Sequence, residues 1–478
     1  MSPISNGQAR LVVDLDGTLV RTDMLFETFC SAFARDWRTL HRCLPAVIRG
    51  KAELKRVLAE AATVDVTTLP YDAAVLDLIH RHKDAGGRVA LVSASDQKIV
   101  TAVSEHLGHF DEAFGSDGTT NLKGRQKGDF LEERYGPEGF IYVGDSGADV
   151  EVWRSAKDIV TVNASRETKS RVEALGRPVR HLDADPLSYR AYLSALRPHQ
   201  WLKNLLIFVP LLVGHRFDLL TVGHSLVTYI IFCLVASGVY VINDLVDLRS
   251  DRAHPRKRLR PFASGAVPLA HALIMIPILL SIGMVLSAWM GWLVTLVVAT
   301  YFLLTTAYSF VLKQRIGVDI CALAILYTLR IVAGGVATGI SLSVWLLAFS
   351  LFFFFALAAL KRQVELADMV NRNEKKAQGR GYFVEDMTVL VPAILASGYV
   401  AVLVLALYVA SEQVTRLYSQ PAALWGICIL LFYWITRIVI LANRGTMHDD
   451  PIVFALTDRV SYVCLAGILG FAVAGALL

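Results

Sequence analysis

Several features that would assign the chain to a common class are missing from its sequence. Only six cysteines occur among the 478 residues, none forms a CxxC pair, and four stand inside apolar stretches. This usage argues against a disulfide framework and a zinc site, and it fits a reducing compartment. The first ten residues, MSPISNGQAR, lack the apolar core of a signal peptide. We therefore expect the N-terminal part to remain in the cytoplasm.

Long hydrophobic runs are absent from the first part of the chain and dominate the rest. Up to about Pro198 charges are mixed with short apolar runs, whereas from Trp201 onward long apolar stretches alternate with short charged ones. The hydrophobic content of 54% exceeds what a soluble protein needs. We expect a soluble domain at 1–165, a linker at 166–198 and a membrane domain at 199–478.

The membrane part contains nine apolar segments, and the charges between them are unevenly distributed. The segments are roughly 201–214, 219–242, 267–289, 291–312, 317–339, 342–360, 388–410, 421–441 and 452–477. Loops on one side carry Arg249, Arg252, Arg256, Lys257, Arg258, Arg260, Lys313, Arg315, Lys361, Arg362, Arg372, Lys375, Lys376, Arg380 and Arg444. Loops on the other side carry only Arg216 and Arg416. By the positive-inside rule, this predicts an inner-membrane protein with its charged loops in the cytoplasm.

The formal net charge of +5 raises the question of a nucleic-acid partner. Much of the basic excess stands next to apolar segments, where the membrane topology already accounts for it. We therefore expect no nucleic-acid binding.

The first domain alternates short β-branched runs with helical stretches. Its runs at 11–13, 89–92, 141–143 and 159–162 are apolar without alternation, which is typical of a parallel sheet buried on both faces. Residues 20–85 are long for a connection and mostly helical, which suits a small cap after the first strand. We predict an α/β Rossmann-like domain with a helical cap.

Polar residues follow the first three of these runs, where ligands bind in open α/β sheets. They are Asp14 and Asp16, then Ser93, then Asp145 and Asp149. Two acids two residues apart can divide labour, one attacking phosphorus and the other protonating the leaving oxygen. Lys123 and Lys127 add cations. A hard divalent cation that bridges carboxylates and phosphate would suit this set.

The run Asp14-Leu15-Asp16-Gly17-Thr18 and the downstream elements resemble the haloacid dehalogenase superfamily, in its phosphoserine-phosphatase-like branch, over residues 10–165. The resemblance implies that Asp14 is the nucleophile that forms an aspartyl-phosphate and that Asp16 is the general acid/base. It further implies phosphate binding by Ser93 and Lys127, with Lys123 as the rival lysine, and Mg²⁺ ligation by Asp14, Asp145 and Asp149.

A second acidic group stands at the end of the second apolar segment. On a helix, Asn243, Asp247 and Asp251 share one face, and Asp244 lies alongside. Stacked acids repel one another unless a cation neutralises them, so we predict Mg²⁺ that also holds a diphosphate. A solvated helix end is the alternative interpretation.

This NDxxDxxxD pattern resembles the UbiA-type intramembrane prenyltransferase superfamily, which implies an all-α domain of nine transmembrane helices around a cavity open to the cytoplasm. Members that act on aromatic acceptors usually carry a second DxxxD cluster after the sixth span. Here that place holds the mixed run 361–368, which includes Lys361, Arg362, Glu365 and Asp368. Such a cluster suits a phosphate that lacks full metal neutralisation.

Three further stretches, 196–204, 251–255 and Lys361-Arg362, resemble the polyprenyl-phosphate phosphoribosyltransferase branch. The resemblance implies phosphoribosyl diphosphate (PRPP) as donor and a polyprenyl phosphate as the attacking acceptor. Asn243, Asp244, Asp247 and Asp251 would hold the magnesium diphosphate, with Asp244 and Asp247 as the catalytic pair. Lys203, Lys361 and Arg362 would bind the ribose phosphate. Tyr308, Lys313 and Asp319 are additional candidates at the cytoplasmic ends of segments.

Fusion of the two domains suggests sequential action. The transferase would make a lipid-linked phosphoribose, and the phosphatase would remove its terminal phosphate to leave polyprenylphosphoryl-ribose. Two alternatives remain open at this point. One is an ordinary prenyltransferase that moves an isoprenyl group to an aromatic or quinone-type acceptor, and the other is a non-enzymatic lipid carrier with a regulatory soluble domain.

Overall fold

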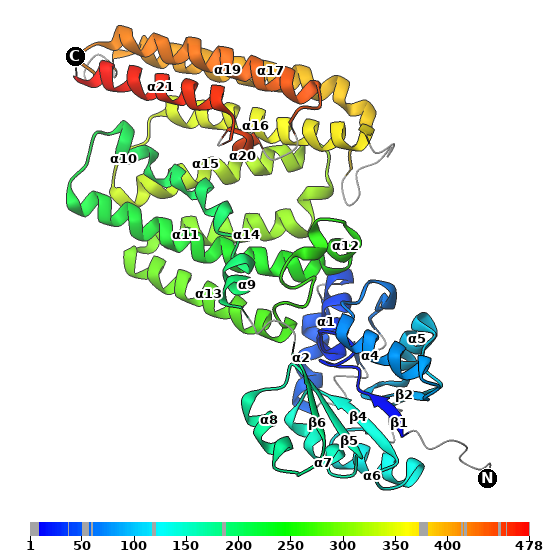
Figure 1. Ribbon diagram of the computed structural model, residues 1–478. Coiled ribbons are helices and arrows are strands. Elements are labelled where there is room, and N and C mark those ends of the chain that lie inside the picture. The colour runs from blue at the N-terminus through cyan, green and yellow to red at the C-terminus, as the bar shows by residue number, and fades with distance from the viewer. Residues whose placement is uncertain are drawn as a thin grey trace. The chain divides into compact units, whose positions relative to one another are not determined.

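The computed structural model describes most of the chain, in two compact units (Figure 1). The described residues are 9–36, 38–49, 57–58, 61–116, 121–183, 188–371, 381–412, 414, 418–447, 451–455 and 457–477. The first unit combines Met1–Pro198 with Tyr240–Ile278, and the second combines His199–Val239 with Leu279–Leu478. The domain expected at the N-terminus therefore shares a unit with Tyr240–Ile278, from the part expected to lie in the membrane.

The first unit contains a six-stranded parallel sheet, whose strands run side by side in one direction (Figure 1). Its strands are β1 (Arg10–Val13), β2 (Val89–Asp96), β3 (Glu112–Ser116), β4 (Phe140–Gly144), β5 (Asp158–Val162) and β6 (Val179–Leu182). Their order is β3-β2-β1-β4-β5-β6. Val13 pairs with Leu91 on one side and Val143 on the other. The carboxyl ends of β1, β2 and β4 are thus neighbours.

Helices cover both faces of this sheet. They are α4 (Ala73–Asp84), α5 (Gln97–Leu107), α6 (Arg125–Tyr135), α7 (Val150–Trp153) and α8 (Arg166–Glu173). Val75 of α4 is buried in the same cluster as Leu91, and Trp153 of α7 is buried with Val92 on the other face. Asp72 caps α4 by accepting hydrogen bonds from its first amides. The predicted α/β architecture is confirmed.

Two expected boundaries differ from the structure. The stretch 166–198, expected as a linker, contains α8, the edge strand β6 and α9 (Tyr189–Ala195), so the sheet extends beyond residue 165. The cap expected at 20–85 contains α1 (Met24–Arg35), α2 (Thr39–Arg49) and η1 (Val66–Thr68), but α4 packs against the sheet. A polar surface helix and a four-residue edge strand carry too weak a hydrophobic signal for the sequence to reveal them.

Eight helices among the described residues are long and apolar enough to cross a membrane. They are α11 (Leu219–Val246), α13 (Leu269–Met290), α14 (Trp292–Phe310), α15 (Val318–Thr338), α16 (Val344–Asn371), α17 (Met387–Val409), α19 (Trp425–Asn443) and α21 (Arg459–Leu477). The first predicted segment, 201–214, instead forms the 3₁₀ helix η3 (Pro198–Phe208) and the short α10 (Val209–Val213). Pro210, which lacks an amide hydrogen, stands at the start of α10.

The core of the second unit lies between α15, α16, α17 and α19. Tyr327, Phe354, Ile394 and Trp434, one from each helix, are buried in a single apolar cluster. Together with the eight long apolar helices, this supports a multi-pass membrane protein. Of the loop cations used to predict its orientation, Arg372, Lys375, Lys376, Arg380 and Arg416 lie outside the described residues.

Candidate active sites

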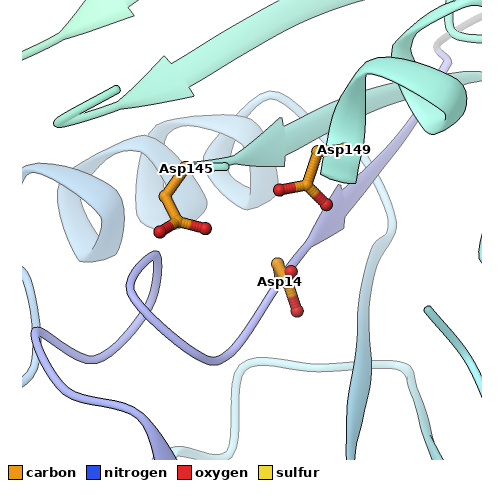
Figure 2. A group of neighbouring side chains, drawn as sticks. All are labelled: Asp14, Asp145 and Asp149. Atoms are coloured by element: carbon orange, nitrogen blue, oxygen red, sulfur yellow. The ribbon is translucent and has the colours of Figure 1, made fainter. Parts of the chain in front are cut away.

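The adjacent strand ends of the sheet bring three carboxylates together. Asp14 follows β1, Asp145 follows β4, and Asp149 ends the 3₁₀ turn η2 (Gly147–Asp149). One oxygen from each of the three lies within 4.8 Å of the others. Figure 2 shows the three side chains converging on a shared space. Ser93, on the neighbouring β2, is fully buried.

Gly17 makes room for this arrangement. Its φ of +70° is a left-handed conformation that side chains rarely adopt, and a Cβ there would lie 2.3 Å from Asp145 Oδ2. The turn after β1 therefore needs glycine to let Asp145 approach.

Lys127 supplies a positive charge inside the site. Its Nζ lies 2.8 Å from Asp14 Oδ2 and 3.9 Å from Asp149 Oδ1, and its side chain is 3% exposed. The rival Lys123 is exposed to solvent. Between the two lysines that the sequence left open, Lys127 is the one that contacts the carboxylates.

The buried charges shift one another's titration. Burial raises the pKa of Asp14 to about 7, against the pull of Lys127 in the other direction, and the neighbouring Asp149 and Asp16 add to the rise. Burial also raises the pKa of Asp145 well above its usual value, and Asp149 and Asp14 reinforce that shift. Burial alone would lower the pKa of Lys127, but Asp14 and Asp149 outweigh it, so that this ammonium stays charged. The Lys127 ammonium is thus the positive charge that lies beside the carboxyl groups of Asp14, Asp145 and Asp149.

Asp16 is oriented by Ser93 and by two groups that the sequence analysis did not single out, the amide of Met24 and the hydroxyl of Ser95. Its Oδ1 accepts the amide hydrogen of Met24 at 2.7 Å, at the start of α1. Its Oδ2 accepts hydrogen bonds from Ser95 Oγ at 2.6 Å and from Ser93 Oγ at 3.2 Å. Ser95 stands two positions after Ser93 in β2, so the period of a strand puts both on one face and offered a signal for it.

Tyr142 is a second residue that sequence reasoning missed. Its hydroxyl accepts a hydrogen bond from Lys127 at 2.9 Å and donates to Asp149 Oδ1 at 2.9 Å. Burial and the charges of Asp14 and Asp149 raise its pKa, so it remains a donor. The only signal in the sequence was a Tyr, which has a hydroxyl, in a strand where Phe would fill the same apolar space.

The donor set at this site fits a divalent metal. Three carboxylates face one another, all are oxygen donors, and burial together with the neighbouring acids raises the pKa of Asp14 and Asp145. Asp14, Asp145 and Asp149 would be the ligands.

The second acidic group stands where α11 gives way to α12 (Leu248–Ala253). Asp247 lies between the two helices, and backbone bonds of 2.8 Å link Asp247 to Asn243 and Asp251 to Asp247. The predicted i, i+4, i+8 repeat is therefore present. Asp244 and Asp251 are buried, whereas Asn243 and Asp247 are half-buried.

Arginines neutralise the buried acids of this group. Arg260 Nη1 lies 2.5 Å from Asp251 Oδ2 and 3.5 Å from Asp244 Oδ1, and Arg197 also bonds to Asp244 Oδ1. The sequence led us to expect a metal in this role and did not single out either pairing. The other carboxylate oxygen of Asp244, Oδ2, is buried without a hydrogen-bond partner among the described residues, which leaves a position for a cation.

In the second unit, Arg362 is engaged by protein groups on every side. Its Nε lies 2.6 Å from Asp319 Oδ2, its Nη1 lies 2.5 Å from Glu365 Oε2, and its Nη2 donates to Tyr308 at 2.8 Å. Tyr382 donates to the other oxygen of Asp319 at 2.6 Å. Four of the predicted candidates thus form one network in which Arg362 already has three partners, which disfavours it as a phosphate ligand.

Lys203 and Lys361 line a separate cavity of about 40 Å³. Its other walls are Leu323, Tyr327, Leu357, Ala358 and Pro451. Two ammonium groups beside apolar walls suit a phosphate attached to a hydrocarbon. The remaining candidates, Lys313 and Asp368, are half-buried, and neither lines this cavity.

Arg330 of α15 is a buried cation that the sequence analysis missed. It is 5% exposed, its guanidinium lies over the ring of the cavity residue Tyr327, and it donates to Asn204 Oδ1 at 2.9 Å and Tyr301 at 3.0 Å. An arginine inside an apolar segment was itself a signal, because such residues are functional candidates by default.

Comparisons with known proteins find one family in each of the two domains expected from the sequence. Residues 206–454 match the UbiA prenyltransferase family, and residues 11–154 match the haloacid dehalogenase-like hydrolase family. An uncharacterized protein of Sinorhizobium fredii is 40% identical over 455 residues, which cover 95% of this chain and 88% of that protein.

Two named relatives match shorter stretches. Nodulation protein NoeC of Azorhizobium caulinodans is 36% identical over 288 residues, which cover 60% of this chain and 93% of that protein. Decaprenyl-phosphate phosphoribosyltransferase of Mycolicibacterium smegmatis is 40% identical over 179 residues. That match covers 36% of this chain and 56% of the transferase.

Proposed function

Because the chain belongs to the UbiA prenyltransferase family and carries a haloacid dehalogenase-like hydrolase domain, we propose that it makes a lipid-linked ribose in two steps. In the first, a polyprenyl phosphate displaces the diphosphate of PRPP. In the second, the hydrolase domain removes the terminal phosphate from the ribose. The observation that carries the choice of donor is the 40% identity over 179 residues with a decaprenyl-phosphate phosphoribosyltransferase.

In the transferase step the lipid phosphate oxygen attacks the anomeric carbon, and the bond to diphosphate breaks. Asn243, Asp244, Asp247 and Asp251 would hold Mg²⁺ and, through it, the diphosphate, and the metal would stabilise the leaving group. The unpartnered oxygen of Asp244 supports this assignment. Lys203 and Lys361 bind a phosphate, which the cationic cavity supports. No protein nucleophile takes part.

In the hydrolase step the Asp14 carboxylate attacks phosphorus, and the bond to the ribose oxygen breaks as Asp16 donates its proton there. Water then attacks the aspartyl-phosphate, and Asp16 takes up the proton from that water. Lys127 and Ser93 orient the phosphoryl oxygens. Mg²⁺ at Asp14, Asp145 and Asp149 would neutralise the charge that develops on phosphate. We place both sites on the cytoplasmic face of the inner membrane.

Lipid mass distinguishes the two steps. Purified protein is incubated with labelled PRPP and polyprenyl phosphate, and the lipids are compared for wild type, Asp14→Asn and Asp247→Ala. We expect lipid-linked ribose from wild type, lipid-linked phosphoribose from Asp14→Asn, and neither product from Asp247→Ala. If Asp14→Asn does not accumulate the phosphorylated lipid, the two-step scheme is wrong.

The family name also supports a second function, prenyl transfer to an aromatic or quinone-type acceptor. The donor separates the two possibilities. Turnover with a prenyl diphosphate and an aromatic acceptor, without any need for PRPP, would establish the second function and exclude the first.

A further inference from the structure

A buried ion pair joins the hydrolase cap to the acidic helix of the transferase part, within the first unit. Arg252 Nη1 and Nη2 donate to Glu27 Oε2 and Oε1 at 2.9 and 2.6 Å, and both side chains are 5% exposed. A paired, two-pronged geometry of this kind is the most directional of side-chain contacts. Glu27 is in α1, and Arg252 is in α12, next to Asp251.

Apolar residues of the same two helices are buried together, and the pair itself is almost closed to solvent. Cys30 of α1 is buried in one cluster with Leu248 of α12 and with Phe262. Nearby, Gly265 approaches the backbone that follows β1 so closely that a Cβ would lie 2.8 Å from the Arg21 carbonyl oxygen. The contact is therefore a packed interface rather than a surface encounter.

On the hydrolase side, the pair reaches Asp16 through one helix. Glu27 stands one turn into α1, and its amide hydrogen-bonds to the Asp23 carbonyl at 3.1 Å. Met24, at the first position of the same helix, donates its amide to Asp16 Oδ1 at 2.7 Å. A displacement of Glu27 therefore moves the group that orients the proton donor of the hydrolase.

On the transferase side, the pair reaches the acids through the loop after α12. Arg252 Nε donates to the Ala263 carbonyl at 3.0 Å, three residues beyond Arg260. Arg260 in turn binds Asp251 and Asp244. A metal diphosphate bound by these acids would compete with Arg260, and release of Arg260 would loosen the loop that Arg252 contacts.

We infer that Glu27 and Arg252 are positioning residues that couple the two sites, so that diphosphate bound at the acidic helix changes the rate of the hydrolase through α1. This inference rests on the proposed function for the identity of the two ligands. Both residues act through Asp16, and neither touches a reacting atom.

The test uses full-length protein in lipid nanodiscs and the soluble substrate p-nitrophenyl phosphate. The hydrolysis rate is measured with and without magnesium methylenediphosphonate, a diphosphate that resists hydrolysis. We expect wild type to respond by about threefold or more, and Asp247→Ala not to respond, which also controls for direct inhibition at Asp14. If the diphosphonate changes the hydrolysis rate of wild type no more than that of Asp247→Ala, the coupling does not exist.

The double variant Glu27→Met with Arg252→Met removes both charges and keeps the bulk of the pair, which buried ion pairs often tolerate. We expect it to lose the response to the diphosphonate, measured as the ratio of its own hydrolysis rates with and without that ligand. The matched control is Asp65→Asn with Arg249→Gln, which breaks an exposed pair between η1 and α12. It should respond as wild type does, and a double Met variant that also responds fully would refute the inference.

Reciprocity gives an independent measurement. A beryllofluoride complex at Asp14 mimics the phosphoryl group, and by linkage it must change the affinity for the diphosphonate, measured by calorimetry. We expect this change in wild type and not in the double Met variant; an equal change in both would also refute the coupling. If the lipid-mass experiment gives no lipid-linked phosphoribose but the diphosphonate and beryllofluoride still change each other's affinity, the proposed substrates are wrong and the coupling stands.

Discussion

The two acidic groups of the first unit satisfy their charges in opposite ways. At the hydrolase site three carboxylates converge around one buried lysine, and burial holds the pKa of Asp14 near 7. At the acidic helix the buried carboxylates are matched by arginines, since Arg197 and Arg260 both contact Asp244. The first site thus has one ammonium for three carboxylates and would gain the missing positive charge from a metal, whereas at the second site a metal would have to replace arginine. Affinity for the metal should differ accordingly.

The largest effect is expected from removing the internal cation of the hydrolase site. Lys127→Met leaves Asp14 and Asp149 buried without their ammonium partner, and we expect kcat for p-nitrophenyl phosphate to fall by about 10²–10³. The exposed Lys123 serves as the control. Equal losses in Lys123→Met and Lys127→Met would show that contact with Asp14 is irrelevant to catalysis.

A smaller effect is expected at the acidic helix. Arg260→Gln leaves Asp251 without its cation, which should destabilise the protein by about 1–3 kcal/mol and make its melting midpoint more dependent on Mg²⁺. Thermal unfolding is measured without Mg²⁺ and at a series of roughly tenfold increasing Mg²⁺ concentrations. It gives both the loss of stability and the dependence of the melting midpoint on Mg²⁺. The neighbouring Arg258→Gln, at an exposed position, should change neither. An Arg260→Gln protein no more sensitive to Mg²⁺ than wild type would mean that metal and arginine do not compete.

The pH dependence of metal binding should separate the two sites further. At the hydrolase site, the carboxyl of Asp14 is protonated below pH 7 in the absence of metal, so protons compete with the metal there. We expect Mg²⁺ affinity at that site to weaken by about fivefold between pH 7 and pH 6, measured by calorimetry in Asp247→Ala, because the deprotonated fraction of Asp14 falls by that factor. Asp14→Asn in the same background should flatten the profile, and an unchanged slope would contradict the assignment of Asp14.

The smallest effect on stability is expected from a solvent-exposed arginine of the acidic helix. The Arg249 side chain is 72% exposed, and it lies 3.1 Å from Asp65. Exposed ion pairs contribute little, so Arg249→Gln should change the unfolding free energy by less than about 0.5 kcal/mol. Chemical unfolding of Arg249→Gln and Arg260→Gln, each compared with wild type, tests whether the exposed pair contributes less. A larger loss of unfolding free energy in Arg249→Gln than in Arg260→Gln would contradict this prediction.

The sequence predicts the features that follow from regular geometry. The apolar runs indicate parallel strands, and the ends of neighbouring parallel strands meet, so Asp14 and Asp145 were expected together. The same holds for the repeat from Asn243 to Asp251, because a helix returns to one face every fourth residue. The length and apolarity of the later segments likewise predict the membrane helices.

The rest depends on contacts between distant parts of the chain. Glu27 and Arg252 are 225 residues apart, and nothing in either local sequence indicates a partner. Arg362 stands next to Lys361, yet adjacent positions of a helix point in different directions. Arg362 therefore pairs with Asp319, whereas Lys361 lines the cavity. Residues of one charge cluster thereby separate into different environments.

The composition of the first unit also sets an order for its biosynthesis. Its last contribution, Tyr240–Ile278, is translated after all six strands of the sheet and after most of α11. Until the ribosome has passed residue 278, α1 lacks the apolar partners Leu248 and Phe262, and Glu27 lacks Arg252. The hydrolase domain therefore completes its fold only after the first long apolar helix has been made.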